Sequence, residues 1–217
     1  MPAFLAGRAL LEARRGRVAT ARRMLARAAD LKPGGTFGRA GIVPSALAQI
    51  ERMAGDLPAA RKHLAAAEAG IAEDSGAVTI PQRSAHLAVS RVMIELAAGD
   101  VDAARPYLRE AAAAAERSQD GPVTAVVAEA GAQLALADRD PGTAAELLGI
   151  AMAQRGTLDM GSPDVTAALA AVRAALGAAA DGLMTSARSR PRADGAALLV
   201  SYSERRSAVV PMADARQ

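Results

Sequence analysis

The chain has 217 residues, of which 51% are hydrophobic but only 2% are aromatic, and it contains no tryptophan and no cysteine. Without cysteine the chain has no disulfide bonds, thiolate metal ligands or cysteine nucleophile, which is typical of proteins in a reducing cytoplasm. The formal net charge is +3, but residues 1–40 carry +7 whereas residues 41–180 carry −6.

Alanine supplies most of the apolar residues. It is the best helix former, and its small side chain lets helix backbones approach closely. No run of alternating β-branched residues predicts a sheet, and no stretch approaches the length of about 18 apolar residues that a membrane span requires. We therefore expect an all-α, cytoplasmic protein without membrane contact.

One short phrase occurs four times along the chain. It begins at Gly16, Gly55, Gly99 and Arg139, so successive starts are 39, 44 and 40 residues apart. Each copy continues with two alanines and a leucine spaced to share one helix face. These are Ala21/Leu25/Ala28, Ala60/Leu64/Ala67, Ala104/Leu108/Ala111 and Ala144/Leu148/Ala151. A fixed interval of about 20–50 residues indicates a stacked helical repeat.

Each phrase is interpreted as the turn of a helical hairpin. Glycine at its start tolerates the left-handed backbone that ends many helices. Asp56, Asp100 and Asp140 are placed to cap the helix that follows and to complement its dipole. The predicted hairpins cover about residues 3–32, 44–73, 82–117 and 122–154.

A single helix is predicted after the fourth hairpin, at about residues 163–177, with Ser162 as its cap. Beyond residue 188 serine, arginine, proline and glycine dominate the sequence. Such composition at a chain end favours disorder, so residues 189–217 are predicted to form an irregular tail.

The repeated phrase resembles the second half of a tetratricopeptide repeat. In the first unit Ala9, Ala21, Leu25, Ala28 and Pro33 stand at the spacing of that family. The resemblance implies a tetratricopeptide-like superhelix of about four hairpins with a C-terminal capping helix. That repeat domain would occupy residues 1–188.

A second resemblance covers roughly residues 45–180. It rests on Gly99-Asp-Val-Asp-Ala-Ala-Arg105, Asp140-Pro-Gly-Thr-Ala-Ala-Glu-Leu-Leu-Gly149 and Ala171-Val-Arg-Ala-Ala-Leu-Gly177. These segments are similar to the C-terminal helical repeats of large actinobacterial transcriptional regulators, including the Streptomyces antibiotic regulatory proteins and others with a bacterial transcriptional activation domain. The resemblance implies a repeat module of such a regulator. The phosphate-binding motif of the regulators' ATPase is absent from the sequence.

The tetratricopeptide resemblance also implies a binding groove on the concave face, lined by the first helix of each hairpin. Its positions in this sequence are Arg14, Gln49, Arg52, Met53, His86, Val89, Met93, Glu129 and Gln133. Methionine supplies adaptable apolar contacts, and arginine and glutamine can donate hydrogen bonds to a peptide backbone. We expect a protein or peptide partner, such as the ATPase or DNA-binding domain of a regulator. Alternatively, some of these side chains only pack against neighbouring helices.

No catalytic constellation is evident in the sequence. His63 and His86, the two histidines, lie in different predicted helices without a carboxylate at metal-binding spacing. The glycines of segment 34–38 predict a turn between hairpins. The chain is therefore expected to be non-enzymatic and to need no cofactor or metal.

The basic N-terminal hairpin offers a rival interpretation. Its arginines could contact nucleic-acid phosphates, and they are Arg14, Arg15, Arg17, Arg22, Arg23 and Arg27. No aromatic residues lie among them to stack on bases, so direct nucleic-acid binding is not the expectation. A free-standing adaptor protein is a further alternative.

Overall fold

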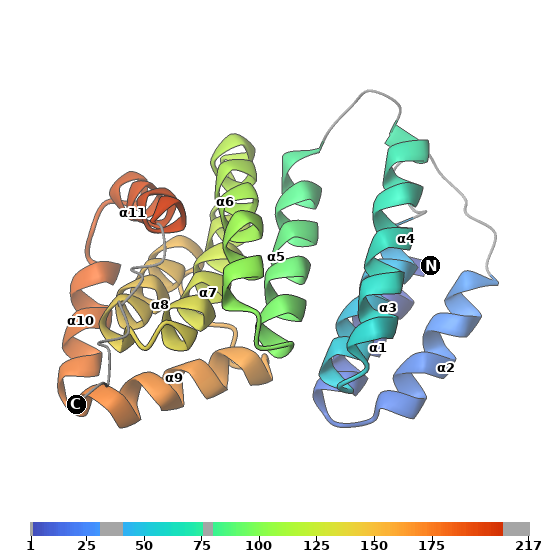
Figure 1. The fold of residues 1–217 in the computed structure, drawn as a ribbon, viewed down its shortest axis with the longest axis horizontal. Helices are drawn as coiled ribbons and strands as arrows, with labels where there is room; N and C mark the ends of the chain where they lie inside the picture. The colour runs from blue at the N-terminus through green and yellow to red at the C-terminus, as the bar shows by residue number, and fades with distance from the viewer. Residues whose placement is uncertain (1, 31–40, 76–79, 206–217) are drawn as a thin grey trace, which may run out of the picture.

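The computed structural model describes residues 2–30, 41–75 and 80–205 (Figure 1). These residues form eleven helices and no strand, which confirms the all-α class. Within the same ranges no helix is long and apolar enough to cross a membrane. The helices are α1 (Pro2–Arg14), α2 (Val18–Ala29), α3 (Ile42–Met53), α4 (Leu57–Ser75), α5 (Pro81–Ala97), α6 (Val101–Ser118), α7 (Gly121–Ala137), α8 (Pro141–Arg155), α9 (Pro163–Leu176), α10 (Ala179–Arg188) and α11 (Arg192–Glu204).

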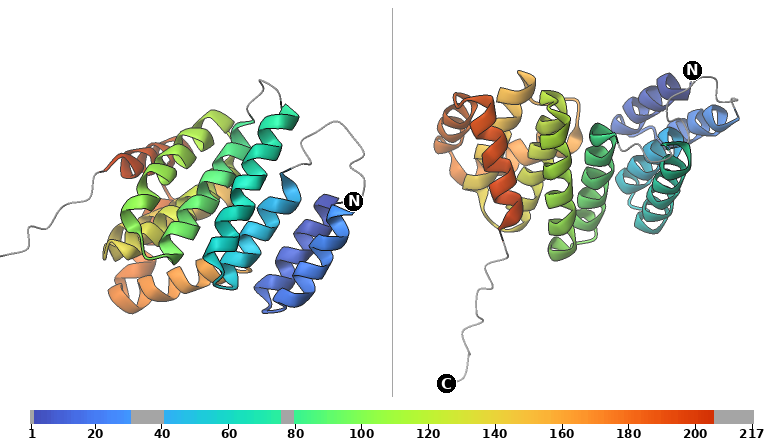
Figure 2. Two further views of the ribbon diagram at one scale, coloured as in Figure 1. Left: turned by 45° about the vertical axis from the view of Figure 1, so that its right-hand side comes forward. Right: turned by 90° about the horizontal axis from the view of Figure 1, so that it is seen from above.

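The first eight helices pair in chain order into four hairpins, from blue to yellow in Figure 1. The first helices of the hairpins, α1, α3, α5 and α7, also contact one another in sequence and form an inner layer. Helix α9 runs across the lower edge of the array in Figure 1, and α10 and α11 pack against α8 beyond it (Figure 2).

The observed helical pairs begin and end within three residues of the predicted hairpins, and α9 ends one residue before the predicted capping helix does. The predicted end of the first hairpin at residue 32 lies outside the described residues, as does the predicted turn at 34–38.

All four hairpin turns share one backbone geometry. The first residue of each phrase has a left-handed φ, at +79° for Gly16, +82° for Gly55, +79° for Gly99 and +60° for Arg139. The N–H of the following residue donates to the carbonyl five residues earlier, at 2.8–2.9 Å in every turn. This is a Schellman motif, which satisfies the last carbonyls of one helix while the chain reverses.

The aspartate caps are confirmed in three of the four turns. Oδ1 of Asp56, Asp100 and Asp140 accepts the backbone N–H three residues later, at 2.9–3.0 Å. Arg17 occupies the equivalent place in the first turn and makes no cap. Ser162 occupies the predicted N-cap position before α9, but its side chain makes no hydrogen bond to the start of the helix.

The alanines and leucines of the repeated phrase form the interior of each hairpin. All twelve are buried, and Leu25, Leu108 and Leu148 have no exposed surface. Burial of a leucine side chain contributes about 1.5–3 kcal/mol. The neighbouring alanines let the paired helix approach closely, so the phrase specifies both the turn and the contact that follows it.

The apolar core is divided into three clusters. A large one spans α5 to α11, and a smaller one, here called the N-terminal cluster, joins α1, α2 and α3. Between them Ala48, Ala60, Leu64 and Ile94 form a small third cluster that connects α3 and α4 to α5. We call this third cluster the joint. Among the described residues it is the smallest of the three clusters.

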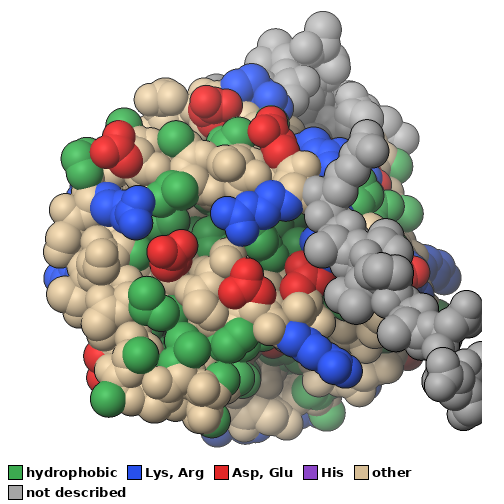
Figure 3. Space-filling view, turned by 60° about the vertical axis from the view of Figure 1, so that its left-hand side comes forward, with side chains coloured by type: hydrophobic (Ala, Val, Ile, Leu, Met, Phe, Trp, Pro, Cys, Tyr) green, Lys and Arg blue, Asp and Glu red, His purple; other side chains and the backbone are tan. Residues whose placement is uncertain are grey.

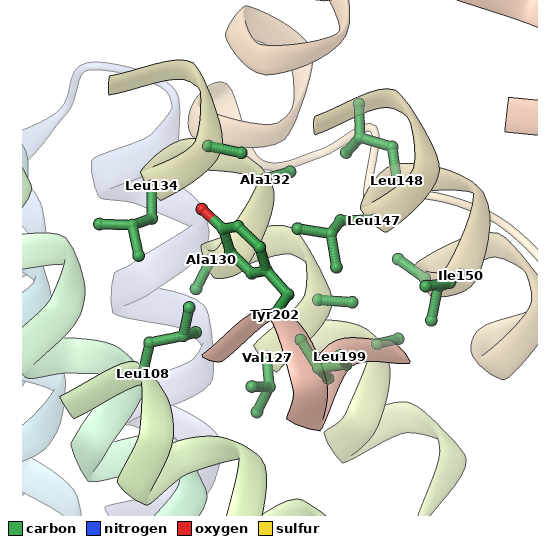
Figure 4. Packing of buried hydrophobic residues seen from close by; sticks show 14 of the residues in the cluster. Leu108, Val127, Ala130, Ala132, Leu134, Leu147, Leu148, Ile150, Leu199 and Tyr202 are labelled. Atoms are coloured by element: carbon green, nitrogen blue, oxygen red, sulfur yellow. The ribbon is translucent and has the colours of Figure 1, made fainter. Parts of the chain in front are cut away.

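The prediction of an irregular tail beyond residue 188 is wrong for residues 192–204, which form α11. Figure 4 shows Leu199 and Tyr202 of this helix among the buried side chains of α6, α7 and α8. Burial raises the pKa of the Tyr202 phenol. Residues 206–217 of the predicted tail lie outside the described residues.

Figure 3 shows the face of the molecule on the side of α10 and α11, where hydrophobic side chains are interspersed with acidic and basic ones. Within the described residues the large hydrophobic side chains that remain exposed are Phe4, Leu11 and Met160. None of these belongs to α10 or α11, so the large apolar side chains of the two C-terminal helices are buried or partly buried.

Helix α10 approaches α8 most closely at Gly149. A Cβ atom at this position would lie 2.7 Å from the Cβ of Ala187 and closer still to the carbonyl oxygen of Met184. Real Cβ atoms do not tolerate such contacts with backbone, so glycine is required where the two helices meet.

We expect Gly149→Ala to lower the free energy of unfolding by about 1–3 kcal/mol, as overpacking does, although alanine is the better helix former. Gly182→Ala in α10 is the matched control, because a Cβ there meets no atom within 4 Å. It should be neutral or stabilising by up to about 1 kcal/mol. Urea unfolding measures both, and equal effects of the two substitutions would refute the close approach.

We expect Arg139→Gly to raise the free energy of unfolding by about 1 kcal/mol, because it relieves a left-handed backbone at a residue with a side chain. The reciprocal change, Gly99→Arg at the equivalent position, should be destabilising by a similar amount. Thermal unfolding of both variants tests this, and stabilisation by Gly99→Arg would contradict it.

Candidate functional site

A pocket of about 140 Å³ opens on the inner layer of helices. Side chains of α1, α3, α5 and α7 line it, together with residues from the connection between α8 and α9. We call it the inner pocket, and we call residues 156–164, which end in the first turn of α9, the crossing segment.

Eight of the nine residues predicted for the groove line the inner pocket. They are Arg14, Gln49, Arg52, His86, Val89, Met93, Glu129 and Gln133. Met53 is the exception, because it packs against the N-terminal cluster. It follows Arg52 directly, and one residue turns a helix by about 100°, so the two side chains point to different faces. For Met53 the alternative interpretation, packing between helices, applies.

Helical spacing explains how side chains from distant parts of the chain meet. Residues three or four apart lie on one helix face, and His86, Val89 and Met93 follow this spacing in α5. Glu129 and Gln133 do so in α7. The hairpin turns then place these faces side by side in the inner layer.

The crossing segment brings two carboxylates to the arginines of the pocket. Arg52 donates two hydrogen bonds to the carboxylate of Asp164, at 2.6 and 3.3 Å. Arg14 donates one to Asp159 at 3.1 Å. These contacts connect the first two hairpins to the start of α9, and the sequence analysis missed them because the partners are 112 and 145 residues apart.

Two residues of α7 hold the backbone of the crossing segment. The amide of Gln133 donates to the carbonyl oxygen of Asp164 at 2.5 Å. Glu129 accepts the backbone N–H of Asp159 at 3.2 Å and two hydrogen bonds from Arg155, at 2.5 and 3.1 Å. Glu129 is buried, and a buried carboxylate requires such partners. It therefore serves as an anchor, with its oxygens already occupied.

The side chains of Gln49, His86 and Ser162 line the pocket and make no hydrogen bond within the described part of the chain. His86 remains accessible to solvent, yet desolvation by the surrounding protein lowers the pKa of its imidazole. The carboxylate of Asp120 opposes this shift, and Arg155 adds to it. The neutral imidazole can donate one hydrogen bond and accept another.

Further arginines, which do not line the inner pocket, link successive hairpins. The pairs are Arg22–Glu51, Arg61–Glu95 and Arg105–Asp138. Each arginine stands six residues after the start of its phrase. The sequence analysis did not use this recurrence, although the arginine at the same position of three phrases is visible in the sequence.

Part of the charge of the basic N-terminal hairpin is paired with carboxylates of the chain. Its ion pairs are Arg14–Asp159, Arg15–Glu12, Arg17–Glu12 and Arg22–Glu51. Four of the six arginines proposed for phosphate contact are thus already paired. In the described ranges, no group of three or more His, Cys, Asp or Glu residues could hold a metal ion.

We expect the imidazole of His86 to titrate below the ordinary histidine value of about 6.5. Because its pKa is lower in the folded than in the unfolded state, folding loses stability as the pH falls below that value. Proton NMR measures the midpoint, and His63→Gln assigns the signal by removing the other histidine. A midpoint at or above the ordinary value would contradict the desolvation of His86.

No family model, curated protein or solved structure matches the chain. The likeness to tetratricopeptide repeats and to actinobacterial regulators therefore rests on the residues quoted for it.

Proposed function

We propose that the chain is a tetratricopeptide-like, non-enzymatic interaction module of a cytoplasmic bacterial transcriptional regulator. It binds an extended segment of a partner protein, or of another domain of its regulator, on the face around the inner pocket. The observation that carries the proposal is the convergence of eight predicted groove residues from four hairpins on this one pocket.

The contacts of the crossing segment support this function. Glu129 binds a backbone N–H of the irregular stretch before α9, and Gln133 binds a backbone C=O in the first turn of α9. Hydrogen bonds to backbone groups, with pockets for side chains, are how extended peptides are recognised. Gln49 and His86 offer further unoccupied donors and acceptors on the same face, and Met93 offers adaptable apolar surface.

Binding of nucleic acid by the basic hairpin has weaker support, since four of its arginines are already ion-paired. It also makes a distinct prediction, because phosphate contacts weaken steeply as the salt concentration rises. Affinity for double-stranded DNA that falls steeply with salt and is lost in an Arg23→Gln/Arg27→Gln variant would favour this rival.

The proposal is tested by selecting peptides from a random displayed library on the full chain and measuring their dissociation constants. We expect Gln49→Ala combined with His86→Ala to weaken binding about tenfold or more, the effect of losing about 1.4 kcal/mol of hydrogen bonds. Both positions lie on helices whose buried residues are left unchanged, so the fold should persist.

His63→Ala is the matched control, because this histidine lies on α4 outside the inner pocket. It should leave the affinity unchanged. Selected peptides that bind the pocket variant and the control equally tightly would overturn the assignment of the binding face.

A further inference from the structure

The crossing segment occupies part of the face proposed for the partner. At one end the side chain of Asp159 binds Arg14 and its N–H binds Glu129. At the other end the side chain of Asp164 binds Arg52 and its carbonyl binds Gln133. Side chain and backbone are thus both engaged at each end, as in a bound ligand.

The two arginines and the two carboxylates belong to different parts of the molecule. Leu158 and Val165, which flank the acidic residues, are buried in the large cluster of α5 to α11. Arg14 and Arg52 lie in the last turns of α1 and α3, on the far side of the joint. Within the described residues the ion pairs Arg14–Asp159 and Arg52–Asp164 join these two parts in addition to the joint, and ion pairs can exchange partners in a way that packed side chains cannot.

The ion pairs are accessible enough to be exchanged. The side chains of Arg14 and Asp159 are 30% and 35% exposed, whereas in the second pair Asp164 is 34% and Arg52 is 13% exposed. Three of the four side chains are thus partly exposed, and pairs at such sites contribute little net stability. A carboxylate from another chain could therefore replace either aspartate at small cost, because the arginine exchanges one equivalent partner for another.

We propose that the partner segment is acidic, and that its carboxylates bind Arg14 and Arg52 in place of Asp159 and Asp164. The crossing segment is then an internal competitor that holds the arginines until a partner arrives. This inference rests on the proposed function and specifies the chemistry of its ligand.

An internal competitor has a measurable consequence. A tethered group acts at a high effective concentration, and the apparent affinity for an external ligand falls with the fraction of open molecules. Removing the negative charge of Asp159 and Asp164 should therefore strengthen the binding of an acidic peptide, whereas loss of Arg14 and Arg52 should weaken it.

The probe is a capped synthetic peptide of residues 156–165, which carries both aspartates. Its binding to the full chain is compared with that to Asp159→Asn/Asp164→Asn. We expect the double variant to bind it at least about tenfold more tightly than the unchanged chain. Adding Arg14→Gln and Arg52→Gln to the double variant should remove the gain, as should a peptide with both aspartates replaced by asparagine.

Asp194→Asn is the matched control, because Asp194 also lies in the first turn of a helix, α11, but is exposed and outside the inner pocket. It should bind the peptide as the unchanged chain does. Circular dichroism checks that each variant folds. If the double variant does not fold, the single variant Asp164→Asn is compared with the unchanged chain instead. Equal affinities of variant and unchanged chain, or no binding to the folded variant, would overturn the inference.

The two proposals fail separately. Selected peptides that depend on Gln49 and His86 but gain nothing from the aspartate substitutions would leave the proposed function standing and reject the internal competitor. If instead the aspartate substitutions strengthen binding of the probe, and the selected peptides bind equally well without Gln49 and His86, the internal competitor stands and the proposed function is rejected.

Discussion

The left-handed residue at each hairpin turn is the constraint on which the array depends. It lets the chain reverse within a Schellman motif, so that the repeated alanines of the second helix face the first helix at close range. Because every turn has this geometry, the first helices line up in one layer and present their remaining faces together. The inner pocket is a consequence of four equivalent turns, although its own residues differ from repeat to repeat.

The molecule is held together unevenly along its length. From α5 onward a continuous apolar cluster joins seven helices, whereas the joint contains four buried residues. Ion pairs supplement it: Arg61–Glu95 and Arg91–Glu68 connect α4 with α5, and Arg14 and Arg52 reach the crossing segment. Polar links of this kind respond to salt and to competing charges, whereas the packed C-terminal body does not.

Most of the fold up to α9 could be predicted because its signals are local. Glycine, aspartate and the Ala/Leu face lie within about a dozen residues of one another, and each has a direct physical meaning. Helix α11 could not be predicted in this way, since Leu199 and Tyr202 are stabilised by side chains of α6 to α8. The residues of the inner pocket could be predicted from their positions in the first helix of each repeated hairpin. Their partners Asp159 and Asp164 could not, because nothing near them in sequence indicates where the chain crosses.

The positions of the two tyrosines give the molecule two built-in optical reporters. With no tryptophan in the chain, ultraviolet emission arises from Tyr107 and Tyr202. Tyr107 lies beside Leu64 and Ile94 of the joint, with the guanidinium of Arg91 5.1 Å from its ring centroid. Tyr202 is enclosed in the C-terminal core (Figure 4). Separation of the N-terminal hairpins from the C-terminal core would change the emission of Tyr107 and leave that of Tyr202 unchanged. Variants that contain only one of the two tyrosines would show each signal separately.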